Sequence, residues 1–153
     1  PRTLMTPPFV HTMKVRFRDT DVQGHVYFGT YFEFCDEAYS AYMRALGVPW
    51  QEMVEGGVDM FYANATCDYR GSARFEDTIH IDVRIARIGD TSVTSEFTIR
   101  DAADAVLARA SLTSVCVDPS TRGKVRVPDA FREAVAAFQD GPGVDEAQKV
   151  TRM

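Results

Sequence analysis

The segment spanning residues 29–46 constrains the fold more than any other part of this sequence. Its polar side chains recur at spacings of three and four residues and form one narrow stripe: Glu33, Asp36, Glu37, Ser40 and Arg44. Nearly every other position is apolar, so the pattern predicts a helix that other elements enclose over most of its circumference. At 1.5 Å per residue this helix would span about 27 Å, and Gly47 and Pro49 are expected to end it.

Most of the remaining chain shows the two-residue alternation of strands that bury one face. A first strand is expected around residues 13–17, after an irregular arm over residues 1–12. Four further strands are predicted at residues 58–69, 79–86, 93–100 and 105–117. Short connections between the last three favour an antiparallel meander. The sequence therefore predicts an α+β fold in which a five-stranded antiparallel sheet wraps around one long central helix, and Pro128 opens a short C-terminal helix.

The length of 153 residues favours one domain, and a composition of 45% hydrophobic and 25% charged residues excludes wholesale disorder. We assign residues 1–140 to this single domain. Residues 141–153 have little to bury and are expected to form a flexible tail.

Charge and cysteine usage exclude several function classes. The net charge of −5 gives no general basic surface for a nucleic-acid partner. No apolar run reaches the roughly 18 residues of a membrane span, and no basic-then-apolar leader opens the sequence. The thiols of Cys35, Cys67 and Cys116 are far apart, which suits reduced cysteines and a cytoplasmic protein. Neither they nor the histidines show metal-ligand spacing, so we expect no metal and no other cofactor.

The densest polar cluster is the aspartate loop, residues 19–28, which leads directly into the predicted helix. The N-terminus of a helix offers free backbone N–H groups and a positive dipole end beside Asp19, Asp21 and His25. Such donors would stabilise an oxygen that gains negative charge during acyl transfer, and a nearby carboxylate can act as nucleophile or general base. The residues alone leave open the alternative that an aspartate caps an ordinary turn and that His25 packs beside it.

The sequence FRDTDVQGHVYFGTY at residues 17–31 resembles the motif D-x-D-x-x-G-H/I-V-x-x-x-x-Y that opens hotdog-fold acyl-CoA thioesterases. The subgroup is that of 4-hydroxybenzoyl-CoA thioesterase and the bacterial YbgC-like enzymes. The resemblance continues through LGVPW at residues 46–50, YANATCDY at 62–69 and FEDTI at 75–79. It covers residues 13 to about 138 and implies the hotdog fold, which agrees with the fold expected from periodicity.

The resemblance also implies roles for residues of the aspartate loop. Asp21 matches the family's catalytic carboxylate, which attacks the thioester carbonyl or activates water. Gly24, His25 and Val26 match the turn whose backbone N–H groups polarise that carbonyl, and the His25 ring is expected to orient or support. We expect Asp19 to have a structural role in the turn.

A homo-oligomer is implied as well, with a dimer as the minimal unit and a tetramer as the expected assembly. In this family two subunits build each active site, so residues 58–78 are expected to face the aspartate loop of a partner. The side chains assigned to substrate binding are Tyr31, Asn64, Thr66 and Tyr69. For the strand residues among them, ordinary strand packing is the alternative.

Basic residues form local patches on this acidic chain. Coenzyme A carries phosphates that guanidinium groups would pair with, whereas each charge alone is more often a solvated strand edge. The residues assigned to the phosphates are Arg70, Arg74, Arg122, Lys124 and Arg126.

The expected reaction is hydrolysis of an acyl-CoA thioester to a free acid and coenzyme A. Three alternatives stay open: hydrolysis of a carrier-protein thioester, a hotdog hydratase or dehydratase, and an acyl-CoA-binding module without catalysis. The hydratases rely on a histidine at the start of the helix, and the Asp21 motif does not match theirs. Aromatic, short aliphatic and long acyl groups are all compatible with the sequence.

Overall fold

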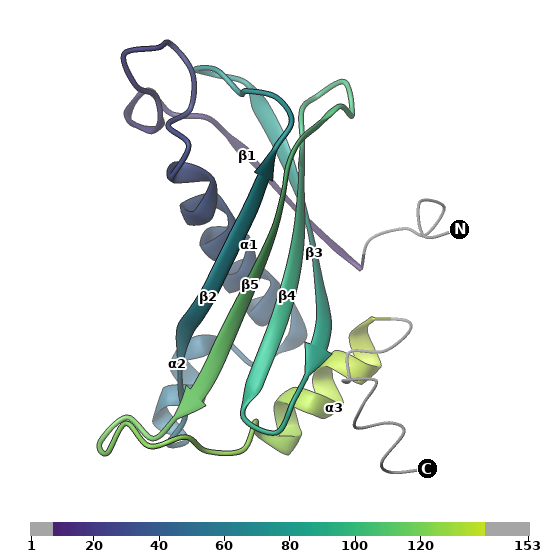
Figure 1. Ribbon diagram of the computed structural model, residues 1–153. Helices are drawn as coiled ribbons and strands as arrows, with labels where there is room; N and C mark the ends of the chain where they lie inside the picture. Colours follow the sequence, from purple (N-terminus) through teal and green to yellow (C-terminus); the bar gives the residue numbers. More distant parts are fainter. Residues whose placement is uncertain (1–7, 140–153) are drawn as a thin grey trace.

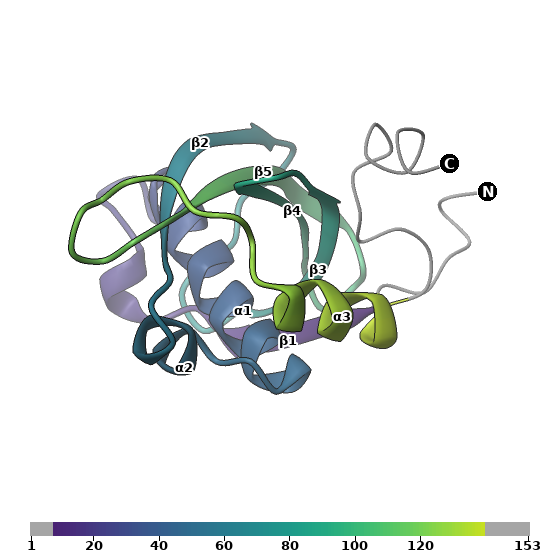
Figure 2. The same cartoon turned by 90° about the horizontal axis from the view of Figure 1, so that it is seen from below.

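The computed structural model describes residues 8–139 and contains one antiparallel sheet of five strands in the order β1-β3-β4-β5-β2. The strands are β1 (Phe9–Lys14), β2 (Asp59–Tyr69), β3 (Thr78–Ile88), β4 (Ser92–Arg100) and β5 (Val106–Val117). The helices are α1 (Thr30–Leu46), α2 (Trp50–Glu55) and α3 (Asp129–Phe138), with a short 3-10 helix, η2, at Phe17–Asp19. The sheet curls around α1, and β1 and β2 form its two edges (Figure 1, Figure 2). The expected tail at residues 141–153 lies outside the described residues.

Helix α1 confirms the prediction from its narrow polar stripe. The side chains of its apolar face are buried against the sheet: Thr30, Tyr31, Phe34, Cys35, Ala38, Tyr39, Tyr42 and Met43. The polar stripe remains exposed. Gly47 ends the helix in a left-handed conformation with φ of 86°, and its N–H donates to the Arg44 carbonyl at 3.1 Å. The helix has 17 residues, so it extends about 25 Å along the inner face of the sheet.

The strands β3, β4 and β5 form the predicted meander. In β3, Ile79, Ile81, Val83 and Ile85 are fully buried, whereas the alternating polar residues are only half-buried. The inward residues pack against α1 and form the main part of the core. Within residues 8–139, no helix is long and apolar enough to cross a membrane.

The start of the chain differs from the prediction in two respects. Strand β1 begins at Phe9, so residues 9–12 pair with β3 and do not belong to an irregular arm. Phe17 does not continue the strand: it lies in η2, is 76% exposed and contacts the ring of Phe75. The Asp19 carboxylate explains the early end, because it accepts the Arg16 backbone N–H at 2.8 Å and turns the chain. The remainder of the expected arm, residues 1–7, lies outside the described residues.

The predicted C-terminal helix, α3, closes the lower end of the sheet (Figure 2). At its end the buried Gln139 side chain donates to the Ile85 carbonyl at 2.8 Å and accepts the Ile85 backbone N–H at 3.1 Å. Its amide oxygen also accepts the Tyr42 hydroxyl. Strand β1 pairs with β3 only as far as Val83, so Gln139 takes the place of a further β1 residue. The helix α2, which the sequence did not predict, joins α1 to β2.

Candidate active site at the start of α1

The aspartate loop is a tight turn that holds Asp21 at its surface. The Asp21 N–H donates to the His25 carbonyl, and the Gly24 N–H donates back to the Asp21 carbonyl, each at 3.0 Å. Gly24 has φ of 85°, a conformation in which other residues are strained. One carboxylate oxygen of Asp21 accepts the Gln23 N–H at 2.8 Å, so the half-buried side chain is oriented by its own loop. The second oxygen of that carboxylate remains available to a ligand.

Asp19 is engaged in a different manner. Its carboxylate is buried at 2% exposure and accepts the Arg16 side chain at 3.0 and 3.2 Å as well as the Arg16 backbone. Hydrogen bonding to Asp19 raises the pKa of the Arg16 guanidinium. This geometry agrees with the structural role expected for Asp19 and leaves Asp21 as the accessible carboxylate of the motif.

The loop consumes two of the three backbone donors that the resemblance assigned to the oxyanion. Gly24 donates within the turn, and the Val26 N–H donates to the Ala73 carbonyl at 2.9 Å. Among the described residues, the N–H groups of His25, Phe28 and Gly29 have no acceptor. Phe28 and Gly29 were missed because the sequence does not show which N–H groups a turn of this shape uses internally.

Two tyrosines anchor the junction between loop and helix. The buried Tyr31 hydroxyl accepts the Ala73 N–H at 3.0 Å, and its ring meets the ring of Tyr69 edge-on at 5.5 Å. Tyr69 in turn donates its hydroxyl to the Phe28 carbonyl at 2.6 Å. Burial raises the pKa of Tyr31 and raises the pKa of Tyr69 to about 12, so both keep their protons at neutral pH. The structure therefore brings Tyr31 and Tyr69 together beside the aspartate loop.

The structure separates Asn64 and Thr66 from that loop. A β-bulge interrupts the β2–β5 register, because Tyr62 pairs with Ser114 and Asn64 pairs with Thr113, which leaves Ala63 unpaired. The bulge reverses the alternation, so Asn64 and Thr66 lie on the outer face of the sheet, away from α1. Alternation read from the sequence does not reveal such an insertion.

The candidate phosphate-binding residues fall into two groups at opposite ends of β2. Arg70 and Arg74 follow the end of β2 beside the aspartate loop, where Arg74 donates to the Gly24 carbonyl at 3.2 Å. The second group follows β5 at the other end of the molecule (Figure 1). Strand β2 has eleven residues, which corresponds to about 35 Å between the two groups.

In the second group, the Arg122 guanidinium lies 4.4 Å above the ring of Phe61 on β2. Lys124 forms an isolated antiparallel bridge with Val117. Arg126 is 3.4 Å from Asp90, so part of its charge is already paired within the chain. These contacts fix the connection between β5 and α3 against the exposed strand β2.

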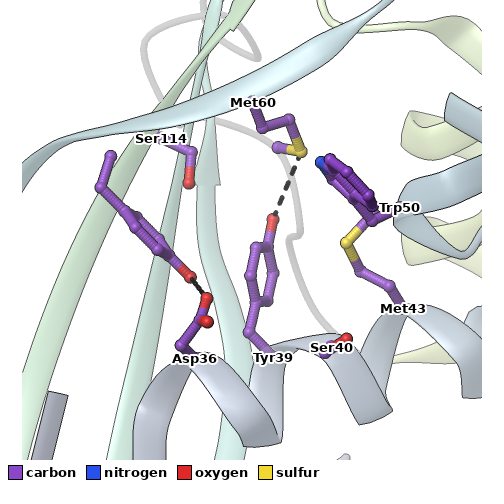
Figure 3. A pocket seen from close by; sticks show the side chains of 8 residues that line it. Asp36, Tyr39, Ser40, Met43, Trp50, Met60 and Ser114 are labelled. Atoms are coloured by element: carbon purple, nitrogen blue, oxygen red, sulfur yellow. Dashed lines mark hydrogen bonds between the residues drawn. The ribbon is translucent and has the colours of Figure 1, made fainter. Parts of the chain in front are cut away.

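A cavity of about 260 Å³ lies between α1, α2, β2 and β5 (Figure 3). Its lining residues are Asp36, Tyr39, Ser40, Met43, Trp50, Met60, Tyr62 and Ser114. Sequence reasoning did not connect these residues, although Asp36 and Ser40 belong to the polar stripe. Within residues 8–139, no group of three His, Cys, Asp or Glu side chains could hold a metal ion.

Comparison with known proteins identifies the family. Residues 15–135 match the Thioesterase-like superfamily. The chain belongs to this family. The predicted thioesterase family is therefore confirmed.

Curated relatives of this thioesterase-like chain are hydrolases of CoA thioesters. A 1,4-dihydroxy-2-naphthoyl-CoA hydrolase from Nostoc punctiforme is 31% identical over 124 residues, which are 79% of this chain and 82% of that protein. The acyl-CoA thioester hydrolase YbgC of Escherichia coli is 29% identical over 114 residues, 74% of this chain and 85% of that protein.

Solved structures confirm the hotdog fold of this thioesterase-like chain. A 1,4-dihydroxy-2-naphthoyl-CoA thioesterase from Synechocystis superposes with a TM-score of 0.79 at 25% identity, covering 88% of this chain and 98% of that one. A gentisyl-coenzyme A thioesterase gives a TM-score of 0.75, also at 25% identity, over 81% of this chain and 99% of that one.

Proposed function

We propose that this chain hydrolyses an acyl-CoA thioester to a carboxylic acid and coenzyme A, with Asp21 as the catalytic carboxylate. The observation that carries the proposal is the half-buried Asp21 beside unpaired backbone N–H groups at the start of α1, in a chain of the thioesterase-like superfamily. A carboxylate next to fixed donors is the arrangement that acyl transfer requires.

The reaction can follow either of two balanced courses. As nucleophile, the Asp21 carboxylate forms a bond to the thioester carbon, the C–S bond breaks, and water then hydrolyses the resulting anhydride. As general base, Asp21 takes a proton from water, which attacks the same carbon and expels the thiolate. In both courses the carbonyl oxygen gains negative charge, and the N–H groups of His25, Phe28 and Gly29 with the α1 dipole would stabilise it.

Homo-oligomer formation through β2 is part of the proposal. Most of β2 is exposed on both faces, and only one of its edges is paired, to β5. If the β2 edges of two copies paired antiparallel, the Arg122–Arg126 region of one copy would approach the aspartate loop of the other. The two separated basic groups would then form one phosphate-binding surface for coenzyme A. A dimer is the minimal unit of this arrangement, and we extend it to a tetramer as the family resemblance implies.

The acyl group and the location are proposed from the relatives and the thiols. The relatives named for dihydroxynaphthoyl-CoA and gentisyl-CoA favour an aromatic acyl group for this chain. Cys35, Cys67 and Cys116 are all free thiols, which supports a cytoplasmic location.

The test of the proposed reaction is the Asp21→Asn variant assayed for thiol release on a panel of aromatic and aliphatic acyl-CoA thioesters. We expect kcat to fall by at least about 100-fold, because the amide can neither attack the carbonyl nor accept a proton. Glu96→Gln is the matched control, since it makes the same carboxylate-to-amide change on the remote strand β4 and should retain full activity. A folded Asp21→Asn enzyme with wild-type turnover would overturn the role of Asp21, and a wild type that hydrates double bonds but cleaves no thioester would overturn the reaction.

A further inference from the structure

The cavity beneath β2 has the size of a ring system. Its volume is about 260 Å³, whereas an apolar cavity of roughly 150 Å³ holds benzene. Room for one or two aromatic rings is therefore available between α1 and the inner face of β2 and β5 (Figure 3).

The walls of the cavity have the chemistry that packs on an aromatic ring. Tyr39 and Met43 rise from α1, and Met60 lies opposite them on β2 (Figure 3). The Trp50 indole is held in place because its Nε1–H donates to the Asp59 carboxylate at 2.9 Å. Aromatic and thioether side chains make favourable edge and sulfur contacts with a bound ring.

One carboxylate interrupts these walls. Asp36 accepts the Tyr62 hydroxyl on Oδ1 at 2.6 Å, and among the described residues its Oδ2 has no hydrogen-bond partner. Partial burial of the Tyr62 ring, together with this hydrogen bond, raises the pKa of Tyr62, so that its hydroxyl remains the donor. An ionised carboxylate only accepts hydrogen bonds. A group that meets the free oxygen of Asp36 must therefore bring an O–H or N–H of its own.

Asp36 also lies on the same face of α1 as the start of the helix. Gly29, Glu33, Asp36 and Ser40 follow one another at spacings of three and four residues. Seven residues separate Gly29 from Asp36, which corresponds to about 10 Å along the helix axis. A thioester carbonyl at the N-terminus of α1 would thus direct a planar acyl group of one or two rings towards the cavity.

We propose that Asp36 is a specificity-determining residue, whose carboxylate in the cavity selects an aryl acyl group that carries a hydroxyl at its far end. The inference rests on the proposed thioesterase function and names the residue that reads the substrate. Asp36 takes no part in the cleavage of the C–S bond. Tyr62 keeps one carboxylate oxygen occupied, and the substrate hydroxyl donates to the other.

The experiment compares pairs of thioesters that differ only in one hydroxyl: benzoyl-CoA with hydroxybenzoyl-CoA isomers, and 2-naphthoyl-CoA with hydroxy-2-naphthoyl-CoA isomers. We expect the wild type to favour at least one hydroxylated member by tenfold or more in kcat/KM, since hydrogen bonds to charged groups discriminate strongly. Asp36→Leu, of similar volume and on an exposed position, should abolish this preference while it keeps turnover of the unsubstituted thioester. Tyr62→Phe should keep the preference, because it frees an acceptor and removes none.

Glu37→Gln serves as the control, because this neighbouring exposed carboxylate does not line the cavity. An Asp36→Leu enzyme with an unchanged hydroxyl preference, or a wild type without any preference, would overturn the inference. Affinities for non-hydrolysable thioether analogues, measured by calorimetry, make the same comparison without turnover. Failure of all hydrolysis therefore counts against the proposed function, whereas loss of discrimination in binding counts against the role of Asp36.

Discussion

Strands β2 and β3 have eleven residues each and belong to the same sheet, yet they are used in opposite ways. In β3 every second side chain is buried beneath α1, and the strand has a hydrogen-bonded neighbour on both sides. In β2 the pattern is exposed almost throughout, the strand pairs only with β5, and a bulge interrupts it. The difference shows that stability and function are separated across the sheet: β3 supplies the core, and β2 supplies a cavity wall and an open edge.

The largest effect is expected from truncation in β3. Ile81→Ala removes a fully buried side chain that faces α1, and we expect the free energy of unfolding to fall by about 2–5 kcal/mol. Thr66→Ala on the exposed outer face of β2 should stay within about 0.5 kcal/mol of the wild type. Urea denaturation of the two variants measures the contrast directly, and equal losses would contradict the division between the strands.

A smaller loss is expected where α3 completes the edge of β3. Gln139→Leu would leave the buried Ile85 N–H and carbonyl without their side-chain partner, and the Tyr42 hydroxyl without its acceptor. Since unsatisfied buried groups cost roughly 1–3 kcal/mol each and water can reach some of them, we expect a total loss of about 2–3 kcal/mol. Urea denaturation checks this value, and hydrogen exchange should show faster exchange of the Ile85 N–H. An exchange rate equal to that of the wild type would show that Gln139 does not protect this edge.

The smallest effect is expected at the open edge of β2. Asn64 is the central residue of the strand, so in an antiparallel pair related by a twofold axis it would lie near its own copy. Asn64→Lys would place two like charges there and weaken association by about 1 kcal/mol or less per cross-strand pair. Light scattering over a dilution series should show dissociation at a higher protein concentration than for the wild type. Glu96→Lys on β4 is the control for the change in charge, and equal dissociation in both variants would argue against pairing through β2.

The sequence predicted the parts of the fold that one strong period controls. The narrow stripe on residues 29–46 and the Ile and Val alternation in β3 depend on burial of one face, and both were confirmed. The start of β1 was missed because His11 and Thr12 weaken the apolar pattern, although Phe9 pairs with Val83. Phe17 was placed in a strand because alternation alone does not reveal the turn that Asp19 imposes.

The candidate site was predicted at the level of the loop and less well at the level of its atoms. The motif correctly located Asp21 at the start of α1, with Tyr31 and Tyr69 beside it. The internal hydrogen bonds of Val26 and the outward orientation of Asn64 depend on how the chain closes in three dimensions. Asp36 escaped notice for the same reason, since a charged residue on an exposed helix stripe gives no sign that a cavity lies above it.

The unpaired Ala63 has a consequence for how β2 tolerates change during evolution. Upstream of it Met60 and Tyr62 face the cavity, and downstream of it Tyr69 faces Tyr31. The bulge therefore acts as a phase marker: the two halves of the strand serve the same side of the sheet only because one residue is inserted between them. Substitutions at position 63 leave this phase intact, whereas deletion of that single residue would turn one half of the strand inside out. Length is thus the inherited property at this point of the chain, and side-chain identity is secondary to it.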